Sequence, residues 1–249
     1  MVDAIAMVST IEDYVEPISA LVDECKLHCN PDEVRVRAVD PANVAMVNTA
    51  LRASAFESYE ADSGLLGLNL DTFEDVLGLG DSDQLAHLEL DHEIRKLDIE
   101  IGETSYTQAL INPQSIRSKP DIPDLELPNT ATVTATQLDH AVTAADLAAD
   151  HILIGVDPQA DTVWFEGEGD TDDVRTAYTD GDCLDARLVE ETRSLFSLDY
   201  LKDVVGAMPS DAEVRLRLGD DWPIELRYEH SEGHASVQVT ISPRVGGED

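Results

Sequence analysis

The chain has 249 residues, of which 16 are Lys or Arg and 52 are Asp or Glu, so its formal net charge is −36. Its 43% of hydrophobic residues is enough for a packed core, which excludes a fully disordered chain, and the length allows one large domain or two ordinary ones. No apolar run approaches the roughly 20 residues that cross a bilayer, and the opening residues carry no basic region and no signal-peptide core. We therefore expect a soluble, cytoplasmic protein.

The first predicted element is a helix over residues 11–23, whose apolar residues form one stripe at Ile11, Val15, Ile18 and Val22. A strand follows directly, and three of its residues alternate along one face: Cys25, Leu27 and Cys29. Because both elements have one apolar face, we expect them to pack on a common core.

The same strand has an alternative interpretation as a metal clip made by Cys25, His28 and Cys29. The spacing is not a standard one, and no second ligand pair follows at the spacing of a zinc site. With Cys183 the cysteines number three, which is no disulfide framework. We therefore favour two buried thiols and expect no metal.

A short helix over residues 73–78, closed by a glycine, is followed by alternating strands around 85–89 and 97–101. Residues 112–128 then carry four prolines, which exclude a helix interior and a central strand. This segment also holds Ile122, Leu125 and Leu127. It therefore reads as an extended linker whose apolar residues need a surface to lie on or a partner to bury them.

The second half of the chain repeats these elements. Leu138, Val142, Ala145 and Ala149 form a helical stripe 127 residues after its counterpart, and an alternating strand over 152–156 follows. Residues 201–206 match 73–78 at an offset of 128, again before alternating strands, here over 214–218 and 224–228. Chance similarity is the alternative, because identities between the halves are few. A repeat of this length indicates two domains of one fold, not a solenoid.

Strands outnumber helices in both halves, so the predicted fold class is α+β with antiparallel sheets. We expect an N-terminal domain over residues 1–111, a connecting loop over 112–128 and a C-terminal domain over 129–249.

No catalytic or nucleotide-binding motif is present. The glycine-rich phosphate loops, the paired-histidine zinc motif and the nucleophile elbow are all missing, and the seven histidines are scattered. Residues 169–173 look superficially like a calcium loop but lack the rest of its spacing. We therefore expect neither an enzyme nor a bound cofactor or metal.

The acidic residues are distributed along the chain, and lysine is nearly absent, with only Lys26, Lys96, Lys119 and Lys202. Self-repulsion at this charge opposes the compact state at low salt, whereas at molar salt the Debye length falls to about 3 Å and the repulsion is largely screened. An acidic protein that binds basic partners would instead carry a clustered patch. The surface therefore resembles those of halophilic archaeal proteins.

Four segments in chain order carry a resemblance to a known family. Residues 37–47 and the Phe-x-Leu-x-Tyr-Leu segment at 196–201 look like signature segments of proliferating cell nuclear antigen and its archaeal equivalents. Residues 121–125 lie where that family has its interdomain connecting loop, and Ser242-Pro243-Arg244-Val245 resembles its C-terminal tail. The resemblance covers the whole chain, and it is to the DNA sliding clamps.

The resemblance implies a homotrimeric ring with helices around the hole, sheets outside and subunits joined head to tail by strand edges. By position, one edge would be Ser105, Tyr106, Thr107, Gln108, Ala109 and Leu110, and its partner on the neighbour would be Asp173, Val174, Arg175, Thr176, Ala177 and Tyr178. Such a ring would encircle duplex DNA without sequence specificity and tether enzymes at the primer end, close to the nucleoid of an archaeal cell.

The resemblance also implies partners that dock a short peptide with a hydrophobic plug: DNA polymerase, the clamp loader ATPase, flap endonuclease and DNA ligase. The implied pocket comprises Val39, Asn43, Val44, Met46, Ile122, Leu125, Pro223, Thr240, Ser242 and Pro243. Thr240 departs from the family, which often has an aromatic residue there.

The implied DNA channel departs further, because its helices carry acidic residues where the family has Lys or Arg. Lys202 is the one cation of the last helix, and His140 stands where an arginine is usual. A ring that holds DNA by linkage tolerates this in molar salt, where counterion release provides little affinity. The alternatives are a member of a mixed ring, a monomeric adaptor or, least favoured, an acidic hydrolase.

Overall fold

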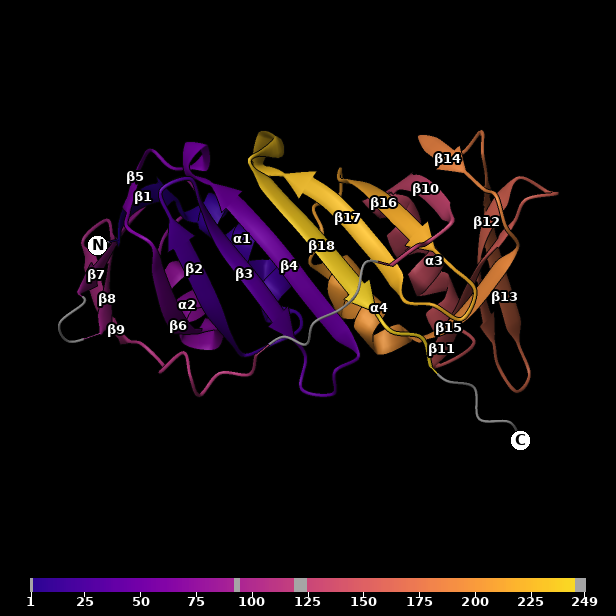
Figure 1. The fold of residues 1–249 in the computed structure, drawn as a ribbon, viewed down its shortest axis with the longest axis horizontal. Coiled ribbons are helices and arrows are strands. Elements are labelled where there is room, and N and C mark those ends of the chain that lie inside the picture. Colours follow the sequence, from indigo (N-terminus) through magenta and orange to yellow (C-terminus); the bar gives the residue numbers. More distant parts are fainter. Residues whose placement is uncertain (1, 92–94, 119–124, 245–249) are drawn as a thin grey trace. The chain divides into compact units, whose positions relative to one another are not determined.

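The computed structural model describes residues 2–91, 95–118 and 125–244, and the chain divides into two compact units. The first unit comprises Met1–Pro41, Met46–Pro120 and Glu229–Val237; the second comprises Ala42–Ala45, Asp121–Tyr228 and Gln238–Asp249. Figure 1 shows both units along the chain. None of the helices in the described ranges has both the length and the apolar character needed to cross a membrane.

The first unit is built from two helices and two antiparallel sheets. One sheet has the strand order β5-β1-β7-β8-β9, and the other contains β4-β3-β2-β6. The elements in chain order are β1 (Val2–Met7), α1 (Val8–Ser19), β2 (Glu24–Asn30), β3 (Glu33–Val39), β4 (Ala45–Arg52), β5 (Ser58–Ala61), β6 (Gly64–Asn69), α2 (Leu70–Leu77), β7 (Leu85–Asp91), β8 (Lys96–Ile101) and β9 (Thr104–Ala109).

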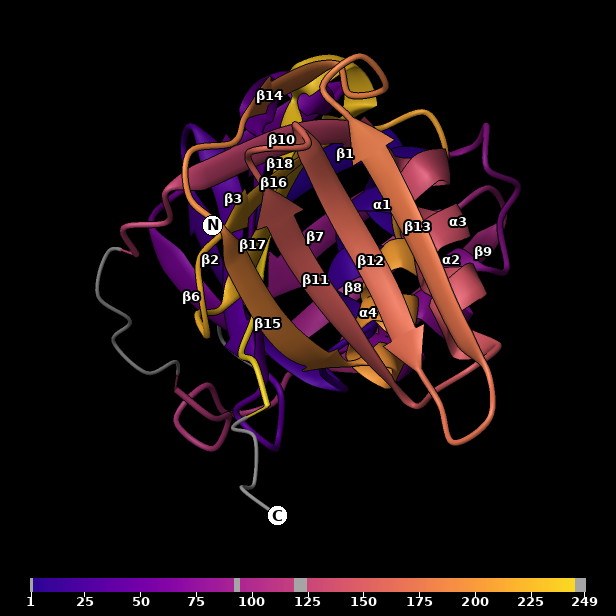
Figure 2. The ribbon, with the colours of Figure 1, turned by 90° about the vertical axis from the view of Figure 1, so that its right-hand side faces the viewer.

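The second unit repeats this arrangement. Its four-stranded sheet has the order β13-β12-β11-β15, and Figure 2 shows α3 and α4 behind that sheet. Its other strands follow the order β14-β10-β16-β17-β18. The elements are β10 (Asn129–Thr134), α3 (Ala135–Asp146), β11 (His151–Asp157), β12 (Thr162–Glu168), β13 (Asp173–Thr179), β14 (Asp185–Arg187), β15 (Thr192–Ser197), α4 (Leu198–Gly206), β16 (Glu213–Leu218), β17 (Ile224–His230) and β18 (Ala235–Ile241).

The two units match element by element, which confirms the duplication. Helices α1 and α3 both have 12 residues, and α3 begins at Ala135, 127 residues after Val8. Helix α4 begins at Leu198, 128 residues after Leu70 of α2. These are the offsets that the apolar stripes predict, and the α+β class with antiparallel sheets is also confirmed.

The predicted helix ends were wrong by about one turn. Helix α1 ends at Ser19 and α3 at Asp146, so Val22 and Ala149 lie beyond the helices. Both helices instead begin three residues before the predicted stripe; in α3 the hydroxyl of Thr134 caps the first turn and Gln137 completes the capping box. An apolar residue just beyond a helix can still face the core, which is why the stripe appears to continue.

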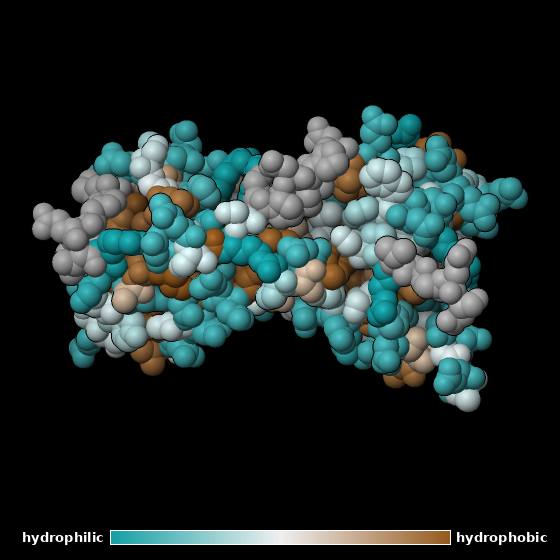
Figure 3. Space-filling model, turned by 60° about the horizontal axis from the view of Figure 1, so that its bottom comes forward, coloured by the Kyte–Doolittle hydropathy of each residue, from teal (hydrophilic) through white to brown (hydrophobic). Residues whose placement is uncertain are grey.

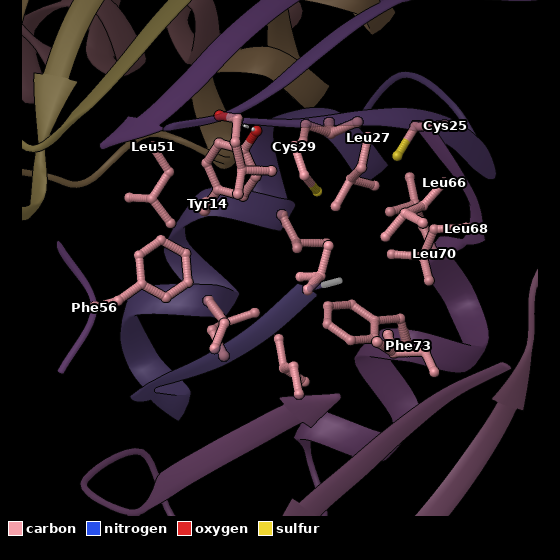
Figure 4. Close-up of a pocket in the computed structure, with 18 of the residues that line it drawn as sticks. Tyr14, Cys25, Leu27, Cys29, Leu51, Phe56, Leu66, Leu68, Leu70 and Phe73 are labelled. Carbon is pink, nitrogen blue, oxygen red and sulfur yellow. Dashed lines mark hydrogen bonds between the residues drawn. The ribbon is translucent and has the colours of Figure 1, made fainter. Parts of the chain in front are cut away.

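The core of the first unit surrounds an apolar cavity of about 70 Å³, shown in Figure 4. Cys25 and Cys29 point into it from β2 beside Leu27, as the alternating pattern predicts. Burial raises the pKa of the Cys25 thiol to about 12 and that of Cys29 to about 11, so both stay protonated at neutral pH. His28 is exposed and lies on the other face of the strand, away from a shared site with the two thiols.

Gly155 lies at a tightly packed point of the second unit's core. It lies on β11 opposite Trp164 of β12 and beside Thr192, and an added Cβ would overlap the Trp164 ring and lie 2.5 Å from the Thr192 carbonyl oxygen. Gly206, at the end of α4, has no atom within 4 Å of an added Cβ. The two glycines therefore offer a crowded position and an open position for the same substitution within one unit.

We expect Gly155→Ala to lower the free energy of unfolding by about 1–3 kcal/mol, because the ring and the backbone must move apart. Gly206→Ala should raise it by about 0.5–1 kcal/mol, because alanine loses less backbone entropy in a helix. Denaturant midpoints in molar KCl measure both. Equal effects of the two substitutions would contradict the packing described around Gly155.

Candidate functional site

The residues predicted to bind partner peptides are divided between the two units. The second unit holds Asn43, Val44, Leu125, Pro223, Thr240, Ser242 and Pro243, and the first holds Val39 and Met46. Ile122 lies outside the described residues. Each unit's contribution is therefore described by itself.

In the second unit, the turn before β4 meets the C-terminal segment. The Ser242 amide donates a hydrogen bond of 2.8 Å to the Val44 carbonyl, which brings together two residues far apart in the sequence. Asn43 supplies the turn with a left-handed backbone, φ 60°, which asparagine tolerates better than most residues. Thr240 is buried at the end of β18, whereas Ser242 and Pro243 are half-buried. The structure thus leaves Val44, Ser242 and Pro243 partly accessible on one side of this unit.

Leu125 is half-buried, and its backbone is held by a side chain that the sequence analysis did not single out. Arg217 on β16 donates from Nη2 to the Leu125 carbonyl at 3.1 Å and from Nη1 to Glu225 on β17 at 2.9 Å. Arg217 and Glu225 are cross-strand partners. The sequence signal for this pair is its opposite charges on two adjacent predicted strands. In so acidic a chain an arginine has many possible acidic partners, so the signal does not identify Glu225.

Trp222 is the other residue that sequence analysis missed. It stands directly before Pro223, in the turn between β16 and β17, and is 49% exposed. Gly219 lies between it and Leu127: an added Cβ there would be 3.0 Å from Leu127 Cδ2 and 3.1 Å from Trp222 Cβ. Leu127 is buried, as expected for an apolar linker residue that needs a surface.

In the first unit, Val39 and Met46 face each other across β3 and β4. Val39 is buried and Met46 half-buried. Close to Val39, Arg117 donates to the carbonyls of Asp40 and Pro41, at 3.1 and 2.7 Å. An arginine therefore also holds the beginning of the connecting segment.

The two strands predicted to join subunits are both terminal strands of their sheets. Strand β9 ends the order β5-β1-β7-β8-β9, and β13 ends β13-β12-β11-β15, as Figure 2 shows for β13. Tyr106 on β9 is 39% exposed, while Gln108 is buried and donates to the Asn69 carbonyl at 2.9 Å. A terminal strand presents unpaired backbone groups and is suited to pairing with another chain.

Arg175 of β13 is held in place before any partner arrives. Its guanidinium carbon lies 4.2 Å from the centre of the Trp164 ring, and Nη1 donates to Glu166 at 2.5 Å. These contacts reduce the freedom of a long cationic side chain on a terminal strand.

The exposed helix faces are acidic in both units. In the second unit His140 and Lys202 are exposed, and Lys202 Nζ donates to Asp146 of α3 at 3.0 Å, which raises the Lys202 pKa above its usual value. The one cation of α4 is thus already paired within its own unit. In the first unit, partial burial and the charges of Asp13, Glu74 and Glu12 raise the pKa of Glu16. Hydrophilic residues cover most of the face shown in Figure 3.

Within the described ranges, no group of three or more His, Cys, Asp or Glu side chains is placed to hold a metal ion. The calcium-like segment at 169–173 instead closes a turn in which the Gly169 amide donates to the Asp172 carbonyl at 3.1 Å.

Comparison with known proteins agrees with this geometry. The N-terminal domain of proliferating cell nuclear antigen matches residues 3–110. DNA polymerase sliding clamps of Natronomonas pharaonis and Halobacterium salinarum are each 48% identical over 245 residues, covering 98% of this chain and 99% of each relative. The solved structure described as the C-terminal region of FEN-1 bound to A. fulgidus PCNA is 31% identical, with a TM-score of 0.93 and full coverage of both chains. PCNA from Thermococcus kodakaraensis is 27% identical, with a TM-score of 0.89 over 98% of this chain and 100% of that one.

The chain is a duplicated α+β protein with this strand order and no catalytic motif. Its architecture is that of a clamp subunit. The chain belongs to the proliferating cell nuclear antigen family. Its function is that of a DNA polymerase sliding clamp, a processivity factor that is not an enzyme.

The acidic face of α1 and α2 yields a prediction for stability. Glu16 follows Glu12 by four residues on α1, and such like-charged pairs cost about 0.2–0.5 kcal/mol. Glu16→Gln should therefore raise the free energy of unfolding by about that amount at pH 7 and low salt, measured by chemical denaturation. The pKa of Glu16 is raised in the folded state. As the pH falls through this raised pKa toward about 4.3, the ordinary value, Glu16 becomes protonated in the folded protein and the wild type regains this stability.

The control is Asp71→Asn, because Asp71 lies in the first turn of α2. A negative charge there interacts favourably with the helix dipole, so its removal should lower stability slightly. The Glu16→Gln gain should shrink in molar KCl. A gain independent of salt would refute the electrostatic explanation.

Proposed function

We propose that three copies of this chain close head to tail into a ring around duplex DNA, with β9 of one subunit paired to β13 of the next. The observation that carries this proposal is that two of the terminal strands in the described sheets, β9 and β13, occupy non-equivalent positions of the repeat. Two different edges on one subunit support a heterologous contact, and such contacts make a ring when the rotation closes. The family membership supports closure at three subunits.

The ring would hold DNA by enclosing it. Helices α1 to α4 would face the hole, and their exposed residues include Asp13, Glu16 and Asp199 beside His140 and the paired Lys202. Attraction to phosphates is therefore weak. In concentrated salt an electrostatic grip would contribute little in any case, because the affinity gained from counterion release falls as bulk salt rises. Enclosure does not depend on salt in this way.

We further propose that replication and repair enzymes dock a short peptide with a hydrophobic plug beside the connecting segment: DNA polymerase, the clamp loader ATPase, flap endonuclease and DNA ligase. The A. fulgidus PCNA structure was solved with the C-terminal region of FEN-1 bound, which supports this mode for a relative of the same fold. In this chain the partly accessible residues Val44, Leu125 and Pro223 supply apolar surface in the second unit. Tethering raises the effective concentration of the bound enzyme at the primer end.

The ring predicts a mass three times 27.1 kDa by light scattering in molar KCl. Tyr106→Asp should shift the protein toward monomers, because it adds a charge to the exposed terminal strand β9 of an already acidic subunit. Leu85→Asp is the matched control: Leu85 is 47% exposed but lies on β7, inside the same sheet. A wild type that stays monomeric at all concentrations, or an equal loss in both variants, would argue against the β9 contact.

The peptide site predicts that Ile122→Ala combined with Leu125→Ala weakens binding of a synthetic archaeal FEN-1 C-terminal peptide by about 2–3 kcal/mol, the scale of an apolar hot spot. Fluorescence anisotropy measures the affinity, and light scattering should show an unchanged oligomer. Val189→Ala removes exposed apolar surface elsewhere in the second unit and should leave the affinity unchanged. Unaltered peptide affinity in the double variant would remove both residues from the site.

A further inference from the structure

A buried carboxylate connects three strands of the second unit. Glu225 on β17 is 3% exposed, and its Oε1 accepts a hydrogen bond from Arg217 Nη1 at 2.9 Å and forms an ion pair with Arg227, whose Nε lies 2.7 Å away. Its Oε2 accepts from Gln238 Nε2 of β18 at 2.7 Å. A buried charge is strongly destabilising when it loses its partners, so this set of bonds holds the three side chains in one arrangement.

Arg217 extends this arrangement to the connecting segment. The guanidinium is planar and its donors have fixed directions, so the bond from Nη1 to Glu225 determines where Nη2 points. Nη2 donates to the Leu125 carbonyl at 3.1 Å. The side chain of Arg217 is 25% exposed, so the bond is partly shielded from water and salt.

Arg227 provides an internal comparison. It lies on the same strand as Glu225 and forms an ion pair with the same carboxylate oxygen, and its side chain is 48% exposed. Among the described residues, no hydrogen bond joins Arg227 to residues 112–118 or 125–128. Both arginines therefore neutralise Glu225, but only Arg217 also holds Leu125.

We propose that Arg217, oriented by Glu225, is a positioning residue of the partner-peptide site: it holds the backbone of Leu125 so that the side chain is presented to the bound peptide. The inference rests on the proposed function, in which partner peptides contact Leu125. Without this bond the peptide itself has to order the end of the connecting segment, and that ordering lowers its affinity.

The test compares Arg217→Gln with Arg227→Gln in the full-length protein, using the fluorescein-labelled archaeal FEN-1 C-terminal peptide. Each variant removes one cation from Glu225. Arg217→Gln should weaken peptide binding roughly tenfold, the effect of losing one charge-assisted hydrogen bond, and Arg227→Gln less than about twofold. Light scattering should show the same oligomer for both.

Arg217→Lys separates positioning from charge. Lysine keeps a cation beside Glu225 but cannot offer two donors in a fixed fork, so unfolding stability should recover while peptide affinity stays reduced. Trp222 gives a second readout, because it and Leu127 flank Gly219. In a Trp164→Phe background, the emission of Trp222 should change in both Arg217 variants and not in Arg227→Gln.

Equal affinities of Arg217→Gln and Arg227→Gln, or full recovery of affinity by Arg217→Lys, would overturn the inference and leave only a charge effect. If Leu125→Ala weakens peptide binding and Arg217→Gln does not, the proposed peptide site is supported and this inference alone fails. If neither variant changes the affinity, the proposed peptide site fails, and the inference with it. If Arg217→Gln does not fold, the peptide affinity of Arg217→Lys is compared with that of Arg227→Gln instead.

Discussion

Electrostatic self-repulsion is the constraint on which the rest of this structure depends. With 52 acidic and 16 basic residues, positive charge is scarce, and three of the described cations are used inside their own unit. Lys202 pairs with Asp146, Arg175 lies on Trp164 beside Glu166, and Arg217 neutralises Glu225. Cations that hold the fold together are not free to attract DNA, which agrees with the proposal that this clamp retains DNA by enclosing it.

The duplication explains how ordinary apolar cores provide the strands of the proposed ring contact. Each unit buries its two helices against antiparallel strands, and the same order of elements appears twice at offsets of 127 and 128 residues. Each repeat carries its own edge strands, and β9 and β13 occupy different places in the repeat. The proposed contact between subunits therefore uses one strand from each repeat, without an added arm or domain.

Much of this follows from the sequence, because apolar periodicity reports which face of an element is buried. The stripes at Ile11 and Leu138 and the alternation at Cys25 predicted the repeat, its length and the buried thiols. The start of α3 was missed although the capping box of Thr134 and Gln137 has a spacing that the sequence shows. The bond from Arg217 to Leu125 was beyond reach, because it depends on how β16, β17 and the connecting segment meet in space.

The arginines at the described ends of the connecting segment bind main-chain carbonyls, of Asp40 and Pro41 in one unit and of Leu125 in the other. Every amino acid has that carbonyl, so Arg217 places no demand on the side chain at position 125, whereas at the other end the attachment depends on Arg117 of the segment itself. The segment can therefore change in sequence around Leu125 while this attachment survives, provided that Arg117 is kept. Clamps of one ancestry could in this way exchange their repertoire of client enzymes by changing a few exposed residues, with no rebuilding of the scaffold.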